Sequence, residues 1–236
     1  MIPIHDTIKS RESPFITLTL ILINAWAFLY ELSLGRELEA FILRYGLVPA
    51  RYTLSAGWDE DLLFRYLPFF TSMFLHGGWI HFLGNMWYLW IFGDNVEDRM
   101  GHLRYLIFYL LCGFIAGYTQ YWTQPLSTVP LIGASGAIAG VLGAYLFLFP
   151  HSTVVTLVPV FLFLTAVEIP AVLFLVLWFF MQFLNGAIAI TSVSQVTGGV
   201  AWWAHIGGFL AGFFLVPVFK KRQVPRYYED EAWPSW

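Results

Sequence analysis

The chain has 236 residues, of which 58% are hydrophobic and 19% aromatic, while only 11% carry a charge. Because about 25% charged residues is usual in a soluble domain, this composition excludes an ordinary soluble protein and indicates that lipid is the main solvent. The formal net charge of −3 argues against a nucleic-acid partner, and the single cysteine, Cys112, excludes an intrachain disulfide.

The predicted elements begin with an apolar run at residues 15–34, which follows a polar N-terminal segment and is not placed like a cleavable signal peptide. A membrane-spanning helix needs about 20 mostly apolar residues. Five further runs follow, so we expect an all-α polytopic membrane protein built as a bundle of six transmembrane helices. The later spans are expected at residues 79–96, 104–123, 135–149, 169–190 and 202–219.

Two segments between these runs need a separate interpretation. Residues 35–78 hold four arginines, several acids and many aromatic residues, so we expect a long structured first loop with short amphipathic helices in the membrane interface. Residues 151–168 are apolar, but prolines and Glu168 interrupt or border the run. We interpret it as a loop lying along the membrane, and a re-entrant segment is the alternative.

The lysines and arginines indicate the orientation, because cytoplasmic loops carry an excess of them. Eight fall on one side of a six-span chain, so that side is expected to be cytoplasmic. They are Lys9, Arg11, Arg99, Arg104, Lys220, Lys221, Arg222 and Arg226. We therefore expect a cytoplasmic N-terminal segment (1–14), a six-span domain (15–219) and a cytoplasmic tail (220–236), in the plasma (inner) membrane of a prokaryote.

Polar side chains inside spans are costly and usually face the bundle interior or a wet cavity. In "LHGGWIHFLGNMWYL", His81 and Asn85 are four residues apart and share one helix face. Ser135 lies among glycines and alanines, and His205 is alone in the last span. Helix packing explains each of these polar residues when it is taken singly. A functional site is indicated only because all of them occur together in one chain.

Small residues line the faces that hold Ser135 and His205. Such stripes let two membrane helices approach closely. On the fourth span the stripe is Ser135, Gly136, Ala139, Gly140 and Gly143, and on the sixth it is Ala201, Ala204, His205, Gly208 and Gly212. If the stripes face each other, the hydroxyl and the imidazole come within hydrogen-bond reach, as a serine nucleophile and its general base require.

The fourth span looks short, because Pro130 and Gly133 suggest that its helix starts near Ser135, below the membrane surface. A helix N-terminus there aims free N–H groups at a nearby oxyanion, and His81 and Asn85 could add side-chain donors. The string "GASG" is not Gly-x-Ser-x-Gly, so the hydrolase nucleophile elbow does not apply.

These motifs resemble the rhomboid family of intramembrane serine proteases over residues 15–219. "HFLGN" resembles the family's His-xxx-Asn, "GASG" its Gly-x-Ser-Gly and "AHIGGFLAG" its His-xx-Gly-xxx-Gly, while "NVEDRMG" resembles its Glu- and Arg-bearing end of the second span. "FRYLPFFTSMFLHGG" is similar to the family's Trp-Arg region, with Phe64 in place of the Trp beside Arg65.

The resemblance implies that Ser135 is the nucleophile and His205 the base of a dyad without aspartate, and that His81, Asn85 and the backbone N–H of Ser135 form the oxyanion hole. It implies helix packing near the site by Gly133, Gly136, Gly208 and Gly212, and structural roles for Glu97 and Arg99. Some members carry a Tyr one turn after the serine that supports the histidine, and here that position is Ala139. No cofactor and no metal are expected. The expected partners are membrane-protein substrates and the lipid bilayer.

Two other functions stay open at this point. A catalytically inactive rhomboid-like protein would use the same fold to bind or escort membrane proteins. A transporter or metalloprotease would use His76, His81 and His205, but the chain has no His-Glu-x-x-His, and two intramembrane imidazoles without a carboxylate make a poor zinc site.

Overall fold

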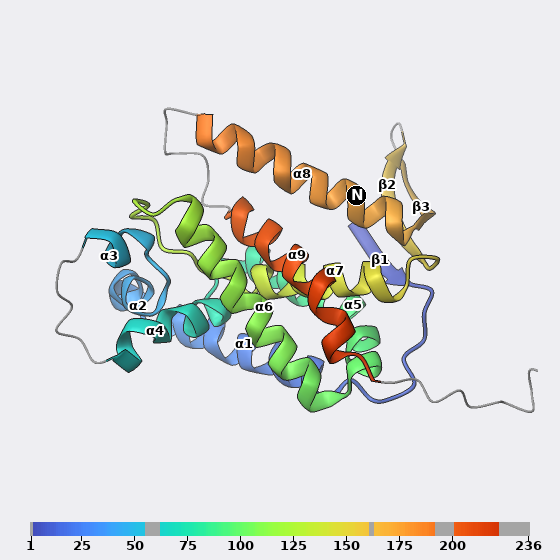
Figure 1. Cartoon of the computed structure of the whole chain (residues 1–236), viewed down its shortest axis with the longest axis horizontal. Helices are drawn as coiled ribbons and strands as arrows, with labels where there is room; N and C mark the ends of the chain where they lie inside the picture. The colour runs from blue at the N-terminus through green and yellow to red at the C-terminus, as the bar shows by residue number, and fades with distance from the viewer. Residues whose placement is uncertain (1, 55–61, 161–162, 192–200, 222–236) are drawn as a thin grey trace, which may run out of the picture.

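A computed structural model describes residues 2–54, 62–160, 163–191 and 201–221. The described chain is mostly helical, with one small sheet at one end (Figure 1). The long helices are α1 (Phe15–Ser33), α5 (Trp79–Met100), α6 (His102–Thr123), α7 (Ser135–Leu148), α8 (Ala171–Thr191) and α9 (Trp202–Phe219).

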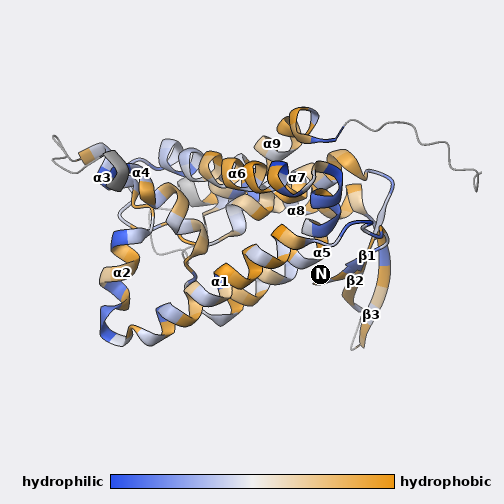
Figure 2. Ribbon diagram, turned by 90° about the horizontal axis from the view of Figure 1, so that it is seen from below, coloured by the Kyte–Doolittle hydropathy of each residue, from blue (hydrophilic) through white to orange (hydrophobic). Residues whose placement is uncertain are grey.

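These six helices lie where the apolar runs predicted them. Three are long and apolar enough to cross a membrane by length and composition: α1, the Ala171–Ile188 part of α8, and α9. Hydrophobic residues dominate along the long helices (Figure 2). Helix α7 is apolar but has only 14 residues, as its late start at Ser135 requires. The chain is therefore a membrane protein with several apolar helices.

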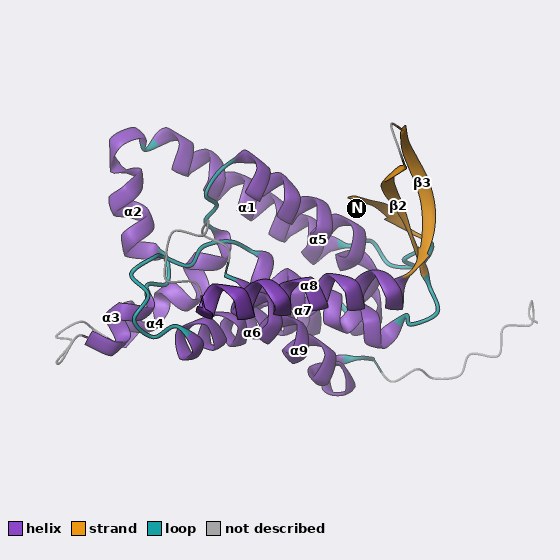
Figure 3. Ribbon diagram, turned by 90° about the horizontal axis from the view of Figure 1, so that it is seen from above, coloured by secondary structure: helices purple, strands orange, loops and turns teal. Residues whose placement is uncertain are grey.

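The fold is mostly helical, as expected, but it is not all-α, because the described chain also forms a three-stranded sheet in the order β1-β2-β3. The strands are β1 (Ile2–Asp6), β2 (Thr153–Val160) and β3 (Phe163–Pro170), and the sheet stands at one end of the helices (Figure 3). The pairs are antiparallel, with Ile2 opposite Leu157 and Thr153 opposite Pro170.

The interpretation of residues 151–168 as an irregular loop is corrected by the same finding. The segment is rich in valine and threonine, which favour strands, and its burial alternates from Ser152 to Thr156. The prolines that suggested a loop lie near the ends of the strands, where proline is tolerated: Pro159 is one residue from the end of β2, and Pro170 ends β3. The N-terminal segment contributes β1 to this sheet, although its polar sequence carries no strand pattern that would predict this.

The connection between α1 and α5 contains the short helices that its amphipathic pattern suggested. They are the 3₁₀ turn η1 (Gly35–Glu37), α2 (Leu38–Tyr45), α3 (Pro49–Leu54), α4 (Leu62–Thr71) and the 3₁₀ turn η2 (Ser72–Phe74). Helix α4 packs on α6, and η2 contacts α1 and α7. This connection therefore reaches the bundle beside the start of α7.

Helix α9 packs against α6 and α7, with α8 alongside (Figure 1). Glycines make the closest approach. A Cβ atom added at Gly208 would overlap the carbonyl oxygen of Gly136, and one at Gly212 would overlap that of Gly140. The two small-residue stripes thus face each other, as their spacing predicted.

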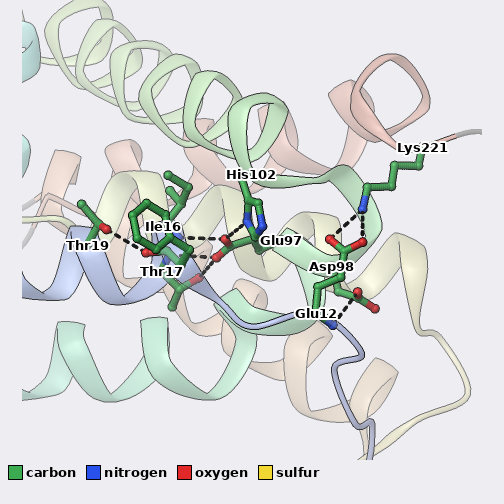
Figure 4. Close-up of polar contacts among 9 residues, drawn as sticks. Glu12, Ile16, Thr17, Thr19, Glu97, Asp98, His102 and Lys221 are labelled. Carbon is green, nitrogen blue, oxygen red and sulfur yellow. Dashed lines mark hydrogen bonds and ion pairs between the residues drawn. The ribbon is translucent and has the colours of Figure 1, made fainter.

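A buried carboxylate joins α5 to the start of α1 (Figure 4). Glu97 accepts hydrogen bonds from the backbone N–H groups of Ile16 and Thr17, each at 2.8 Å, and from the Thr17 hydroxyl at 2.7 Å. His102 Nδ1 lies 2.6 Å from the same carboxylate. Because the first N–H groups of a helix lack partners in the helix itself, Glu97 caps α1 from another element. Nearby, the Arg99 guanidinium lies over the Phe149 ring at 5.0 Å.

Candidate active site

The hydroxyl of Ser135 and the imidazole of His205 meet where α7 and α9 begin. Ser135 Oγ lies 2.7 Å from His205 Nε2. Ser135 is the first residue of α7, and His205 lies in the first turn of α9. The backbone N–H of Ala204 donates to Oε1 of Gln120 on α6 at 3.3 Å, which holds the start of α9 in place.

Residues of the α1–α5 connection form hydrogen bonds with the loop that precedes α7. Leu131 pairs with Leu47 in an isolated bridge, and the Gly133 N–H donates to the Ser72 carbonyl at 2.8 Å. Gly133 has φ +122°, a conformation that favours glycine. The first helical hydrogen bond of α7 runs from Ile138 N to Ala134 O, so the N–H groups of 135–137 lie outside the helical ladder.

Two side-chain nitrogens converge on Gly133 from α5. A Cβ atom added at Gly133 would lie 2.6 Å from His81 Nε2 and 3.6 Å from Asn85 Nδ2. Asn85 is 8% exposed, and its Nδ2 has no hydrogen-bond partner among the described residues. The structure therefore brings His81 and Asn85 together beside the loop that leads to Ser135.

A long hydrogen bond at the other ring nitrogen of His81 favours one tautomer. The Gly77 backbone N–H donates to His81 Nδ1 at 3.4 Å. Because a neutral imidazole carries one proton, that proton then belongs on Nε2, the nitrogen that faces Gly133. His81 and Asn85 both present donors toward the same space.

The second ring nitrogen of His205, Nδ1, is held by a side chain of α8 that was not among the predicted site residues. His205 Nδ1 lies 2.8 Å from Oε1 of Gln182, which is 8% exposed. The Trp178 and Trp202 rings lie 5.9 Å and 6.3 Å from the His205 ring, centroid to centroid. A signal was present in "FFMQFL", since Gln182 is a polar residue inside an apolar run, the pattern that singled out the other site residues.

His76 stands apart from the Ser135–His205 pair. Its ring centroid is 5.2 Å from that of His81, and neither ring nitrogen has a hydrogen-bond partner among the described residues. Its backbone N–H donates to the carboxylate of Glu31 on α1. Burial lowers the pKa of His76 to about 4, so its ring is neutral at pH 7. In the described part of the chain, no three His, Cys, Asp or Glu side chains are grouped as metal ligands would be.

Comparison with known proteins places these residues in a family context. The family model described as "Rhomboid domain" matches residues 63–222, more than half of the chain. The match covers α5 to α9 and therefore all the residues that meet at the Ser135–His205 pair.

Curated relatives come from bacteria, plants, fungi and vertebrates. The chain is 40% identical over 78 residues to "Putative rhomboid protease YdcA" of Bacillus subtilis, which covers 33% of this chain and 39% of the relative. It is 31% identical over 145 residues to "RHOMBOID-like protein 5" of Arabidopsis thaliana, covering 61% and 41%. It is 29% identical over 104 residues to "Rhomboid protein 1, mitochondrial" of Saccharomyces cerevisiae, covering 42% and 30%. The matched segments thus span 30–41% of the length of these relatives.

Proposed function

This chain belongs to the rhomboid family, and we propose that it is an intramembrane serine endopeptidase that cleaves transmembrane segments of other membrane proteins. The observation that carries the proposal is the 2.7 Å contact between Ser135 Oγ and His205 Nε2. A serine hydroxyl is a weak nucleophile at neutral pH, and an adjacent base that takes its proton activates it.

In the proposed reaction, Ser135 Oγ attacks the carbonyl carbon of the scissile amide while its proton moves to His205 Nε2. The tetrahedral intermediate collapses to an acyl-enzyme, and the imidazolium returns the proton to the leaving amine. Water then attacks the ester while His205 takes its proton, and the imidazolium returns that proton to Ser135 Oγ as the acyl–oxygen bond breaks and the acid product leaves. Each proton passes through Nε2, so that nitrogen must be free of hydrogen at the start of each half-reaction.

The carbonyl oxygen becomes an oxyanion in both half-reactions, and we assign its stabilisation to Asn85 Nδ2, His81 Nε2 and the backbone N–H of Ser135. Preorganised donors act strongly in a site with few competing waters. Asn85 Nδ2 is buried without a hydrogen-bond partner among the described residues, which costs about 1–3 kcal/mol, and a substrate oxyanion would supply the missing partner.

We propose that α1, α5, α6, α7, α8 and α9 are six transmembrane helices, with both chain ends on the cytoplasmic side and residues 35–78 in the opposite interface. The proposed domain is 15–219, flanked by cytoplasmic segments 1–14 and 220–236. One matching relative is from a bacterium and another is named as mitochondrial, so the prokaryotic inner membrane remains a prediction from the sequence. The proposed partners are membrane-protein substrates in the bilayer.

The deciding experiment compares the purified chain with its Ser135→Ala variant on a generic single-span substrate, alongside labelling by a fluorophosphonate. We expect cleavage and labelling by the wild type and neither by the variant, because the hydroxyl is the bond-forming group. Wild-type protein that is folded but neither cleaves nor labels would instead support the inactive binding or escort protein.

A further inference from the structure

The imidazole of His205 has a contact at each of its two nitrogens. Nε2 faces Ser135 Oγ at 2.7 Å, and Nδ1 faces Gln182 Oε1 at 2.8 Å. A neutral imidazole donates at one nitrogen and accepts at the other, and the partner of one nitrogen decides the state of the other. The amide oxygen of Gln182 can only accept, so it selects the tautomer with the proton on Nδ1 and leaves Nε2 to receive the Ser135 proton.

We propose that Gln182 is the positioning residue of His205: its amide oxygen sets the tautomer and the ring orientation of the base and stabilises the imidazolium that forms during catalysis. The inference rests on the proposed function and adds a third member to the Ser135–His205 pair. In the rest of the described chain, no other hydrogen-bond partner of the His205 ring is found.

The geometry of α8 supports this role. Trp178 and Gln182 are one helical turn apart, so both side chains leave the same face of α8, and both contact His205. The preceding turn of that face, Phe174 and Leu175, is buried at 3% and 0% exposure. Met181, beside Gln182, is 55% exposed and points away from the bundle. Gln182 is therefore held by a packed helix face.

The position of Gln182 also accounts for a departure in the sequence. Ala139, one turn after Ser135, has no side chain that could support the imidazole from α7. Support comes instead from α8 through an amide and an aromatic ring, with Trp202 at the edge of the His205 ring. The Gln182 amide oxygen carries no formal charge. Burying it with a hydrogen-bond partner therefore avoids the desolvation cost of a buried carboxylate.

The test uses the full chain in detergent, with Gln182→Met as the main variant and Met181→Leu as the matched control on the exposed face. Methionine keeps the length of the side chain but removes the acceptor. We expect kcat to fall roughly 10- to 100-fold, the range of a hydrogen bond to a charged group, with KM nearly unchanged. Met181→Leu should retain wild-type kcat. Gln182→Glu keeps an oxygen acceptor at the same position and should recover most of the loss.

A second readout follows the tautomer itself. Nitrogen-15 spectra of histidine-labelled protein, with the His205 signal identified by its absence in His205→Gln, should show Nδ1–H in the wild type and in Gln182→Glu. In Gln182→Met the two tautomers should mix. Wild-type turnover and an unchanged tautomer in Gln182→Met would overturn the inference while leaving the proposed protease intact. Cleavage that survives Ser135→Ala would overturn the proposed function instead.

Discussion

Gly208 lies directly against the backbone carbonyl of Gly136, so the helices that carry His205 and Ser135 touch without an intervening side chain. The same relationship recurs one turn further along, between Gly212 and Gly140. The separation of α7 and α9 is therefore set by backbone contact.

The first prediction is that Gly208→Ala separates the two helices. The added methyl group overlaps a backbone oxygen that no rotamer change can move, and overpacking of this kind costs typically 1–3 kcal/mol. A displacement of about 1 Å at a reacting pair can cost on the order of 100-fold in rate, so kcat should fall by that order in the folded fraction. Gly84→Ala is the matched control, because a Cβ atom at Gly84 meets nothing within 4 Å. Equal turnover in the two variants would contradict the backbone-contact argument.

The second prediction concerns Gly133, where backbone conformation and space act together. Gly133→Ala places a methyl group 2.6 Å from His81 Nε2 and 3.6 Å from Asn85 Nδ2, on a backbone with φ +122°. Gly35→Ala is also strained, by about 1–3 kcal/mol, at φ +52° in the left-handed region, but its methyl group meets no atom within 4 Å. We expect both variants to melt at lower temperature and only Gly133→Ala to lose cleavage. Loss of cleavage in both variants would show that the effect comes from lower stability and not from displacement of the His81 and Asn85 donors.

The third prediction separates an oxyanion donor from a packing residue at Asn85. Asn85→Ala should lower kcat by about 100- to 1,000-fold and leave KM nearly unchanged, because the donor acts mainly in the transition state. Asn24→Ala removes another buried helix amide, one that donates to the Leu20 carbonyl on α1, and should lower the melting temperature without lowering kcat. Normal kcat with a lowered melting temperature in Asn85→Ala would remove Asn85 from the oxyanion hole.

The fourth prediction is that Glu97→Gln destabilises the junction of α1 and α5. The neutral amide keeps one acceptor but loses charge-assisted bonds to Ile16, Thr17 and His102, which are worth about 1.5–3 kcal/mol each. Thermal unfolding in detergent measures the loss, and turnover of the folded fraction should remain. Glu12→Gln, which removes an exposed carboxylate paired with Lys221, should leave the melting temperature unchanged.

The fifth prediction concerns pH and the attachment of β1. Burial raises the pKa of Asp6 from 3.8 to about 6, while a hydrogen bond from Tyr145 opposes the shift. The folded state binds this proton more tightly than the unfolded state, so the contribution of Asp6 to stability falls as the pH rises from about 4 to 6. Asp6→Asn should reduce the dependence of the melting temperature on pH between about 4 and 6. Glu39→Gln, at an exposed site on α2, is the control for net charge. An unchanged pH dependence in Asp6→Asn would contradict the assignment.

The sequence predicted the helices and the meeting of Ser135 with His205 because both depend on local patterns. Apolar length defines the long helices, and the spacing of small residues such as Gly136 and Gly208 defines the faces that pack. The sheet escaped prediction because β1 and β2 pair across most of the chain, and Pro159 and Pro170 resemble loop signals until the strand ends are known. Gln182 stands out as a polar residue in an apolar run, but α8 has no stripe of small residues around it like those at Ser135 and His205, so its contact with Nδ1 of His205 was not predicted.

The sheet also has a consequence for the order in which the site is completed during synthesis. Ile2 pairs with Leu157, so β1 is translated long before its partner strand and stays unpaired until α1 to α7 have been made. Helix α8 follows β3 directly and brings Gln182, and α9 comes last and brings His205. A nascent chain that ends before α9 has Ser135 but lacks His205, so the proposed catalytic pair forms only after the last helix has been made.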